Sequence, residues 1–338
     1  MCQFQLQLVG LALTLLVCSG YAHVAQKFCE GQCSIQRIHR MMSADCYDRT
    51  CRRIPRNLQS NIEVLDVAFN RIRSVSAEDL KPYSNLKYLY LADNMITHIQ
   101  PEALSDKDSL LALDLSLNSF SSEASIPEVV FQLPSLKYLY LSQNHNINMV
   151  EVIENATPLR APLEYLDISF NYYNDEEWSL LPIMGLMPTL IKYNVSGMSL
   201  ILNTSQFAGL CNLEVWVNAN MSAQFINPCD CWNLDRWLKE RRIVYTNFTN
   251  QCEVKQSECD YVIPQEDMDL FTSCKKEHAE QIFQTKLNKS LLIGGCVLGI
   301  ILIVVVIVLW KWRRTKVNQR KKKNQILNHE ESANLNTF

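Results

Sequence analysis

The stretch LKYLYLADNMI at residues 86–96 carries a spacing of apolar residues that recurs along the chain. Its first six residues, LKYLYL, return unchanged at residues 136–141. The pattern beneath both copies is L-x-x-L-x-L-x-x-N. An internal period of about 20 to 50 residues indicates an architecture of stacked repeats.

Five copies of the pattern align on their asparagines, which are Asn70, Asn94, Asn118, Asn144 and Asn171. These are 24, 24, 26 and 27 residues apart, whereas a helix repeats apolar residues every three to four positions. A sixth copy begins at Leu190 and has Met198 in place of asparagine, and a weaker seventh includes Trp216. This is the leucine-rich repeat pattern. It predicts an α/β solenoid with a parallel concave sheet and about six repeats over residues 60–222.

Within each repeat, the leading apolar residues are expected to fill the core, and the asparagine to bond backbone groups that a turn leaves unpaired. The residues between the core positions then face the concave surface. Two tyrosine pairs flank Ala112 on this surface, which predicts a shallow aromatic slot beside the carboxylates of Asp66, Asp114 and Asp167. The predicted ligand-binding residues are Tyr88, Tyr90, Asp114, Tyr138, Tyr140, Tyr165 and Asp167. Alternatively, these rings only pack against neighbouring side chains of the sheet.

The N-terminal region indicates secretion. Residues 1–22 contain a short apolar run followed by small residues, which is typical of a signal peptide. Residues 23–59 are predicted to cap the first repeat, and they contain four cysteines, Cys29, Cys33, Cys46 and Cys51. In an oxidising compartment these would form two disulfides, whose pairing the sequence leaves open. A zinc site is the alternative.

A second group of cysteines follows the repeats, in the order Cys229-x-Cys231-x20-Cys252-x21-Cys274. The pattern resembles the C-terminal cap of extracellular leucine-rich repeat proteins, here over residues 223–274. That resemblance implies the pairs Cys229–Cys252 and Cys231–Cys274. Cys211 and Cys259 remain, and they either bridge one another or stay unpaired or intermolecular.

The C-terminal region reads as a membrane anchor. Residues 275–290 are polar and are expected to form a stalk, and residues 291–310 are twenty residues without a charge, enough to span a bilayer. The basic tail at 311–338 is predicted to be cytoplasmic and to contact anionic lipid. Gly295 and Gly299 allow a helix-packing face and thus a homodimer.

Charge and motifs exclude several function classes. The tail has eight Lys or Arg and two Glu, or +6, so the rest of the chain carries −3 − 6 = −9, which disfavours nucleic acid as a partner. No enzyme motif, cofactor site or metal site is predicted. Glycosylation is predicted at the motifs N-x-S/T of Asn155, Asn194, Asn203, Asn220 and Asn247, whereas a sixth motif at Asn288 lies two residues from the apolar run and is too close to it.

The whole arrangement of signal, caps, repeats, span and short tail resembles the small type I leucine-rich repeat membrane proteins of the animal cell surface. The resemblance implies recognition of an extracellular or membrane protein ligand at the plasma membrane, as an adhesion molecule or co-receptor without a signalling domain. One alternative is an auxiliary ion-channel subunit that acts through the span and basic tail. Another is an innate immune pattern receptor.

Overall fold

The computed structural model describes residues 29, 33–121, 126–145, 147–171 and 178–335. The predicted signal peptide at residues 1–22 lies outside this part of the chain. The chain forms two compact units, Met1–His278 and Ala279–Phe338, and each is described by itself.

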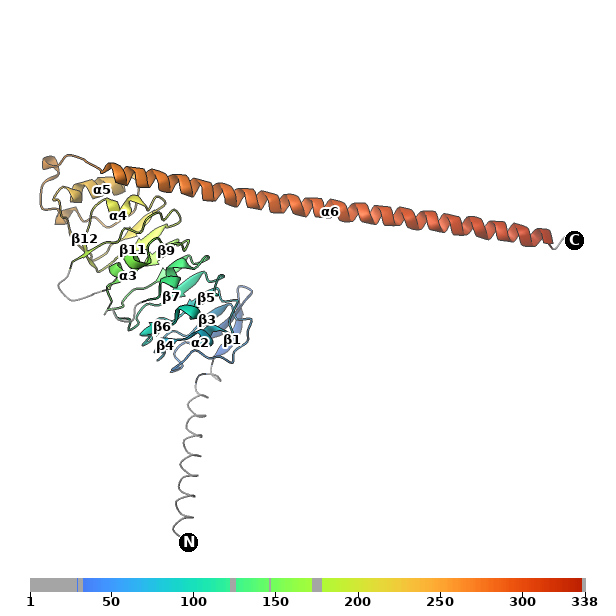
Figure 1. Cartoon of the computed structure of the whole chain (residues 1–338), viewed down its shortest axis with the longest axis horizontal. Helices are drawn as coiled ribbons and strands as arrows, with labels where there is room; N and C mark the ends of the chain where they lie inside the picture. Colours follow the sequence, from blue (N-terminus) through green and yellow to red (C-terminus); the bar gives the residue numbers. More distant parts are fainter. Residues whose placement is uncertain (1–28, 30–32, 122–125, 146, 172–177, 336–338) are drawn as a thin grey trace, which may run out of the picture. The chain divides into compact units, whose positions relative to one another are not determined.

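The first unit is built on a nine-stranded sheet in which consecutive repeats contribute consecutive strands (Figure 1). Strands β1 and β2 pair antiparallel, and all the following neighbours pair parallel, as predicted. The strands are β1 (Ser34–Ile38), β2 (Met41–Asp45), β3 (Val64–Asp66), β5 (Tyr88–Tyr90), β7 (Ala112–Asp114), β8 (Tyr138–Tyr140), β9 (Tyr165–Asp167), β11 (Lys192–Asn194) and β13 (Val215–Val217).

The opposite, convex side is less regular, which explains why the period drifts between repeats. Two short parallel sheets lie there, one of β4 (Ser74–Val75) and β6 (His98–Ile99), the other of β10 (Ser179–Leu180), β12 (Ser199–Ile201) and β14 (Ser222–Gln224). Its short helices are α2 (Ala77–Leu80), η1 (Pro101–Ala103), η2 (Glu128–Gln132), α3 (Met149–Ala156) and α4 (Ser205–Ala208). The repeat leucines between the two sides are fully buried and form one continuous core.

The repeat asparagines bond backbone groups across neighbouring repeats, as the sequence predicts. The side-chain amide of Asn94 donates to the carbonyls of Val67 and Leu91 at 3.0 and 3.1 Å, and its oxygen accepts from the Ile72 amide at 3.0 Å. Asn118 repeats these contacts one turn of the solenoid later. Because these groups are buried, each asparagine satisfies polar atoms that would otherwise lack partners.

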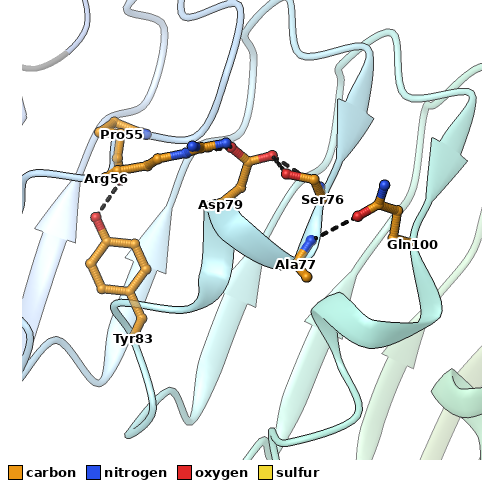
Figure 2. A network of polar contacts seen from close by, with 7 residues as sticks. All are labelled: Pro55, Arg56, Ser76, Ala77, Asp79, Tyr83 and Gln100. Carbon is orange, nitrogen blue, oxygen red and sulfur yellow. Dashed lines mark hydrogen bonds and ion pairs between the residues drawn. The ribbon is translucent and has the colours of Figure 1, made fainter.

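The predicted N-terminal cap contains the disulfides Cys29–Cys51 and Cys33–Cys46, which confirms disulfides over a zinc site. A polar network on the convex side ties the cap to the first repeat (Figure 2). Its centre is the buried carboxylate of Asp79, which accepts two hydrogen bonds from Arg56 and further bonds from Ser76. Tyr83 also donates to the Pro55 carbonyl, so two repeat residues hold the end of the cap.

The segment predicted as the C-terminal cap contains α5 (Asp230–Glu240), η3 (Thr249–Gln251), η4 (Gln256–Glu258) and the first turns of α6 (Gln265–Leu335). The pairing implied by the family resemblance is wrong, and so is the suggested bridge between Cys211 and Cys259. The disulfides are Cys211–Cys274, Cys229–Cys259 and Cys231–Cys252. All ten cysteines between the predicted signal and span are therefore paired.

The position of α6 explains the different pairing. Asp267 and Cys274 are seven residues apart and thus lie on one face of the helix. Asp267 accepts hydrogen bonds from Thr204 and Ser205 at 2.6 and 3.2 Å, which fixes this face on α4. Cys274 therefore meets Cys211, which follows α4, and is not available to Cys231.

Helix α6 has 71 residues and includes the segments predicted as stalk and span. It contains the one stretch of the described residues that is long and apolar enough to cross a membrane, with a mean hydropathy of 3.3. Beyond this apolar stretch, Arg314 lies over the ring of Trp310 and Lys316 over the ring of Trp312.

Candidate binding face on the concave sheet

Each repeat strand of the concave sheet has three residues, of which the middle one enters the core. Strand pairing aligns the outer residues in two rows across the sheet. The first row is Ser43, Val64, Tyr88, Ala112, Tyr138, Tyr165, Lys192 and Val215. The second, here called the acidic row, is Asp45, Asp66, Tyr90, Asp114, Tyr140, Asp167, Asn194 and Val217. All seven predicted binding residues lie in these two rows.

The first row places Ala112 between Tyr88 and Tyr138, as the sequence predicts. Ala112 is only 4% exposed, whereas Tyr138 is 36% exposed and Tyr88 is half-buried. The Tyr138 hydroxyl donates to Glu164 at 3.2 Å, which ties the end of the ring to the residue that precedes β9. The arrangement offers aromatic area with a small residue as its floor. That it binds a ligand stays a prediction.

The acidic row alternates carboxylates and tyrosines from Asp66 to Tyr140. Strands lie about 4.8 Å apart, so Asp66 and Asp114 are separated by about 10 Å with Tyr90 between them. Each of these aspartates accepts a bond from the backbone amide two residues later, Ala68 or Ser116, at 3.0 Å. These contacts leave both side chains half-buried on the concave face.

The carboxylates of the acidic row repel one another. Burial raises the pKa of Asp66, and the charges of Asp45 and Asp114 add to this, against the lowering effect of the Ala68 amide. Burial also raises the pKa of Asp114, and the charge of Asp167 adds to it, against hydrogen bonds from Ser116. Negative charge thus accumulates on a partly desolvated surface, where a cation would relieve it.

Two of the predicted residues are committed to contacts within the protein. Tyr165 donates to Asp167 at 2.9 Å, packs edge-on against Tyr140 and lies under the Lys192 ammonium. Asp167 also accepts from Asn194 at 3.0 Å and is only 9% exposed. The side chains of Tyr165 and Asp167 therefore mainly contact neighbouring side chains of the sheet, as the alternative interpretation predicts. The open part of the face therefore lies over β2 to β8.

Two acidic residues at the flank of the same sheet form ion pairs with lysines, unlike the aspartates of the acidic row. Glu63 and Glu164 directly precede β3 and β9, and each forms an ion pair at 2.6 Å, with Lys87 and Lys137 respectively. Among the described residues, no lysine or arginine forms an ion pair with Asp45, Asp66 or Asp114. Asp45, Asp66 and Asp114 thus lack the lysine partner that Glu63 and Glu164 have.

Sequence reasoning missed an exposed aromatic pair beside the acidic row. Tyr47 and Phe69 stack with ring centroids 5.7 Å apart and are 51% and 49% exposed. Phe69 directly precedes a repeat asparagine, and the residue at this position is left-handed in all five copies, which turns its side chain toward solvent. Apolar residues directly before the asparagines, such as Phe69 and Leu117, were the signal that could have found this surface.

The glycosylation motifs lie in different environments. Asn155, Asn220 and Asn247 are exposed. Asn203 is half-buried. Asn194 lies in the acidic row, where its amide nitrogen bonds Asp167 and its oxygen accepts from the backbone of Ser196. A glycan on Asn194 would replace the contact with Asp167, so the exposed motifs suit modification better.

Comparison with known proteins agrees with this geometry, since residues 60–120 match the family Leucine rich repeat. The fold is a leucine-rich repeat solenoid. The chain is 32% identical over 128 residues to human leucine-rich repeats and immunoglobulin-like domains protein 3. This match covers 31% of this chain and 11% of the relative. The chain is 29% identical to mouse platelet glycoprotein Ib alpha chain over 112 residues, 33% and 15% of the two chains.

A longer match joins the chain to mouse Toll-like receptor 9, with 26% identity over 202 residues. It covers 52% of this chain and 19% of the relative. The chain thus spans less than a quarter of the length of each of these three relatives.

Proposed function

We propose that this protein is a cell-surface recognition protein that binds a protein ligand on the concave face of its solenoid. The observation that carries the proposal is the slot of Tyr88, Ala112 and Tyr138 beside the acidic row. Tyrosine offers a large contact area while losing little side-chain entropy, so it is favoured at protein interfaces. The protein acts as an adhesion molecule or co-receptor, without catalysis.

The proposed site of action is the plasma membrane, with the solenoid outside the cell and residues 311–338 in the cytoplasm. Five disulfides support an oxidising compartment for the solenoid, because cytosolic proteins rarely keep such bonds. The apolar helix and the basic residues after it support a single span with its basic end inside. The names of two relatives, a platelet glycoprotein and a Toll-like receptor, agree with this class of function.

A loss-of-binding experiment tests the proposal. The full chain is produced on cells, and its partner is captured by cross-linking. The substitutions Tyr88→Ala, Tyr90→Ala, Tyr138→Ala and Tyr140→Ala are then combined. Removing one central aromatic anchor commonly costs about 2 kcal/mol, or roughly thirtyfold in affinity, so four together should abolish capture at an unchanged surface level. Tyr261→Ala, in the C-terminal cap, is the control and should leave capture intact.

A second candidate function is that of an auxiliary channel subunit, favoured by the helical continuation of the span into basic residues that stack on Trp310 and Trp312. Exchanging residues 291–338 for an unrelated span and tail separates the two candidates. Recognition through the concave face tolerates the exchange. If the exchange abolishes activity while the tyrosine variant keeps it, the concave-face proposal is wrong.

A further inference from the structure

We propose that the N-terminal half of the concave face binds a basic segment of the partner protein, whose arginine or lysine side chains lie against Asp45, Asp66 and Asp114. This inference rests on the proposed function, because it concerns the same face, and it specifies the chemistry of the ligand. The occupant is a protein segment with several positive charges in succession along its length.

The first argument is that the fold does not require charge at these positions. The side-chain oxygens of Asp45, Asp66 and Asp114 accept from the backbone amide two residues later, at 3.0 to 3.1 Å. Asn194 makes the same contact with the Ser196 amide at 3.1 Å, in the same row. A neutral asparagine can therefore make this hydrogen bond. The negative charge of the three aspartates is not needed for the turn.

The second argument is that none of the three aspartates has an ion-pair partner among the residues that the structure describes. Asp45 and Asp66 lie opposite each other on neighbouring strands, and like charges placed so destabilise a sheet. Lysines are present on the same face, but Lys87 and Lys137 pair with Glu63 and Glu164 at its flank. A partner with positive side chains would supply the missing opposite charge, and charge complementarity favours such a partner over neutral or acidic ones.

The third argument concerns the rings around the carboxylates. Tyr90 lies between Asp66 and Asp114. The exposed, stacked rings of Tyr47 and Phe69 follow Asp45 and Asp66 by two and three residues, and the Tyr47 backbone amide donates to Asp45. A guanidinium can bond a carboxylate while its planar face stacks on an aromatic ring. Carboxylates and accessible rings on adjacent strands are therefore suited to arginine in particular. The spacing of about 10 Å between Asp66 and Asp114 leaves room for one such side chain at each.

The test uses the full chain in a neutral detergent, which avoids the binding of basic peptides to lipid and to other cell-surface molecules. The probe is a peptide of about twelve residues that repeats Arg-Pro-Pro, because polyproline II geometry places arginines about 9 Å apart on one side. Its glutamate counterpart, repeating Glu-Pro-Pro, is the negative control. We expect the arginine peptide to bind, the glutamate peptide not to bind, and binding to weaken as salt is raised.

The decisive variant combines Asp45→Asn, Asp66→Asn and Asp114→Asn, which keeps every turn hydrogen bond. It should lose at least about tenfold in affinity for the arginine peptide. Glu63→Gln removes an acidic residue of the same sheet that is already paired with Lys87, and should change affinity less than about twofold. Equal binding by the wild type and the triple variant, or an equal loss in the control, would overturn the inference.

Failure of this inference is distinguishable from failure of the proposed function. The triple aspartate variant and the quadruple tyrosine variant are compared for capture of the natural partner on cells. If only the tyrosine variant loses capture, the partner is recognised by the concave face, but it does not bind through a basic segment. If both variants retain capture, the concave face is not the binding site and the proposed function is wrong.

Discussion

Cys211 is bonded to Cys274, 63 positions later, and this bridge joins the last repeats to the first turns of α6. The buried carboxylate of Asp267 reinforces the same junction through Thr204. The end of the solenoid core, which would otherwise be exposed, is thereby covered by the helix that continues toward the apolar stretch. Covering the terminal repeat is what a repeat protein requires for solubility.

Breaking this bridge should destabilise the solenoid. A loop of about 63 residues closed by a disulfide corresponds to roughly 4 kcal/mol in the chain-entropy account. We expect Cys274→Ser to lower the surface level of the protein severalfold and to lower its melting temperature. The free cysteine Cys296 offers a matched control, because Cys296→Ser removes no bridge. A non-reducing peptide map that joins Cys274 to Cys231 would contradict the pairing.

The asparagine ladder gives a second prediction. Asn94→Ala leaves the buried amide of Ile72 without its partner. It also removes one of the two side-chain amides that donate to each of the carbonyls of Val67 and Leu91, which still accept from Asn70 and Asn118 respectively. A buried polar group left unpaired costs about 1–3 kcal/mol, so a loss of stability of that size is expected. Thermal unfolding of the purified chain measures it. Asn85→Ala, at an exposed position, is the control, and an equal effect of both changes would refute a role of the ladder in stability.

A third prediction concerns Asp79 in the network of Figure 2. Burial raises the pKa of Asp79, but hydrogen bonds from Ser76 and Arg56 outweigh this and lower the pKa. Its ionised form therefore stabilises the fold above the unfolded pKa, and this contribution is lost as pH falls through the lowered pKa. Arg56→Met should destabilise the protein by about 1–2 kcal/mol at neutral pH and by less in acid. An equal effect at both pH values, or an equal effect of the exposed Arg73→Met, would count against this assignment.

The acidic row predicts a pH dependence of opposite sign. The folded pKa values of Asp66 and Asp114 are raised by burial and by neighbouring carboxylates. The stability that their protonated forms confer is complete below the unfolded pKa and is lost as pH rises through the raised pKa. Asp66→Asn with Asp114→Asn should therefore raise the melting temperature at neutral pH, with no gain near pH 3. A gain that does not depend on pH would show that charge repulsion is not its cause.

The sequence predicted those parts of the fold that depend on a repeated local rule. The buried leucines and the five asparagines follow one spacing, and strand alternation then determines which tyrosines and aspartates face outward. The degraded copies were harder to interpret. Met198 fills the core where an asparagine was expected, and Asn218 replaces an apolar residue and bonds the cap through the backbone of Thr246.

The remaining features depend on contacts between distant segments, which spacing does not encode. Cys274 pairs with Cys211 because one face of α6 lies on α4, and a count of residues between cysteines does not reveal that face. Likewise, the contacts that Tyr165 makes with Asp167 and Lys192 decide that it is less available than Tyr88 or Tyr138. The stacking of Tyr47 on Phe69 joins the cap to the first repeat and was invisible to a pattern read within repeats.

Recognition through the concave face is the central claim, and site-specific photo-cross-linking on intact cells tests it most directly. A photoreactive amino acid is placed at Tyr90 on the concave sheet or at the exposed His98 on the convex strand β6. After irradiation, the products are identified by mass spectrometry at matched surface levels. We predict that position 90 captures a partner protein and that position 98 does not. Capture from position 98 alone would contradict the account.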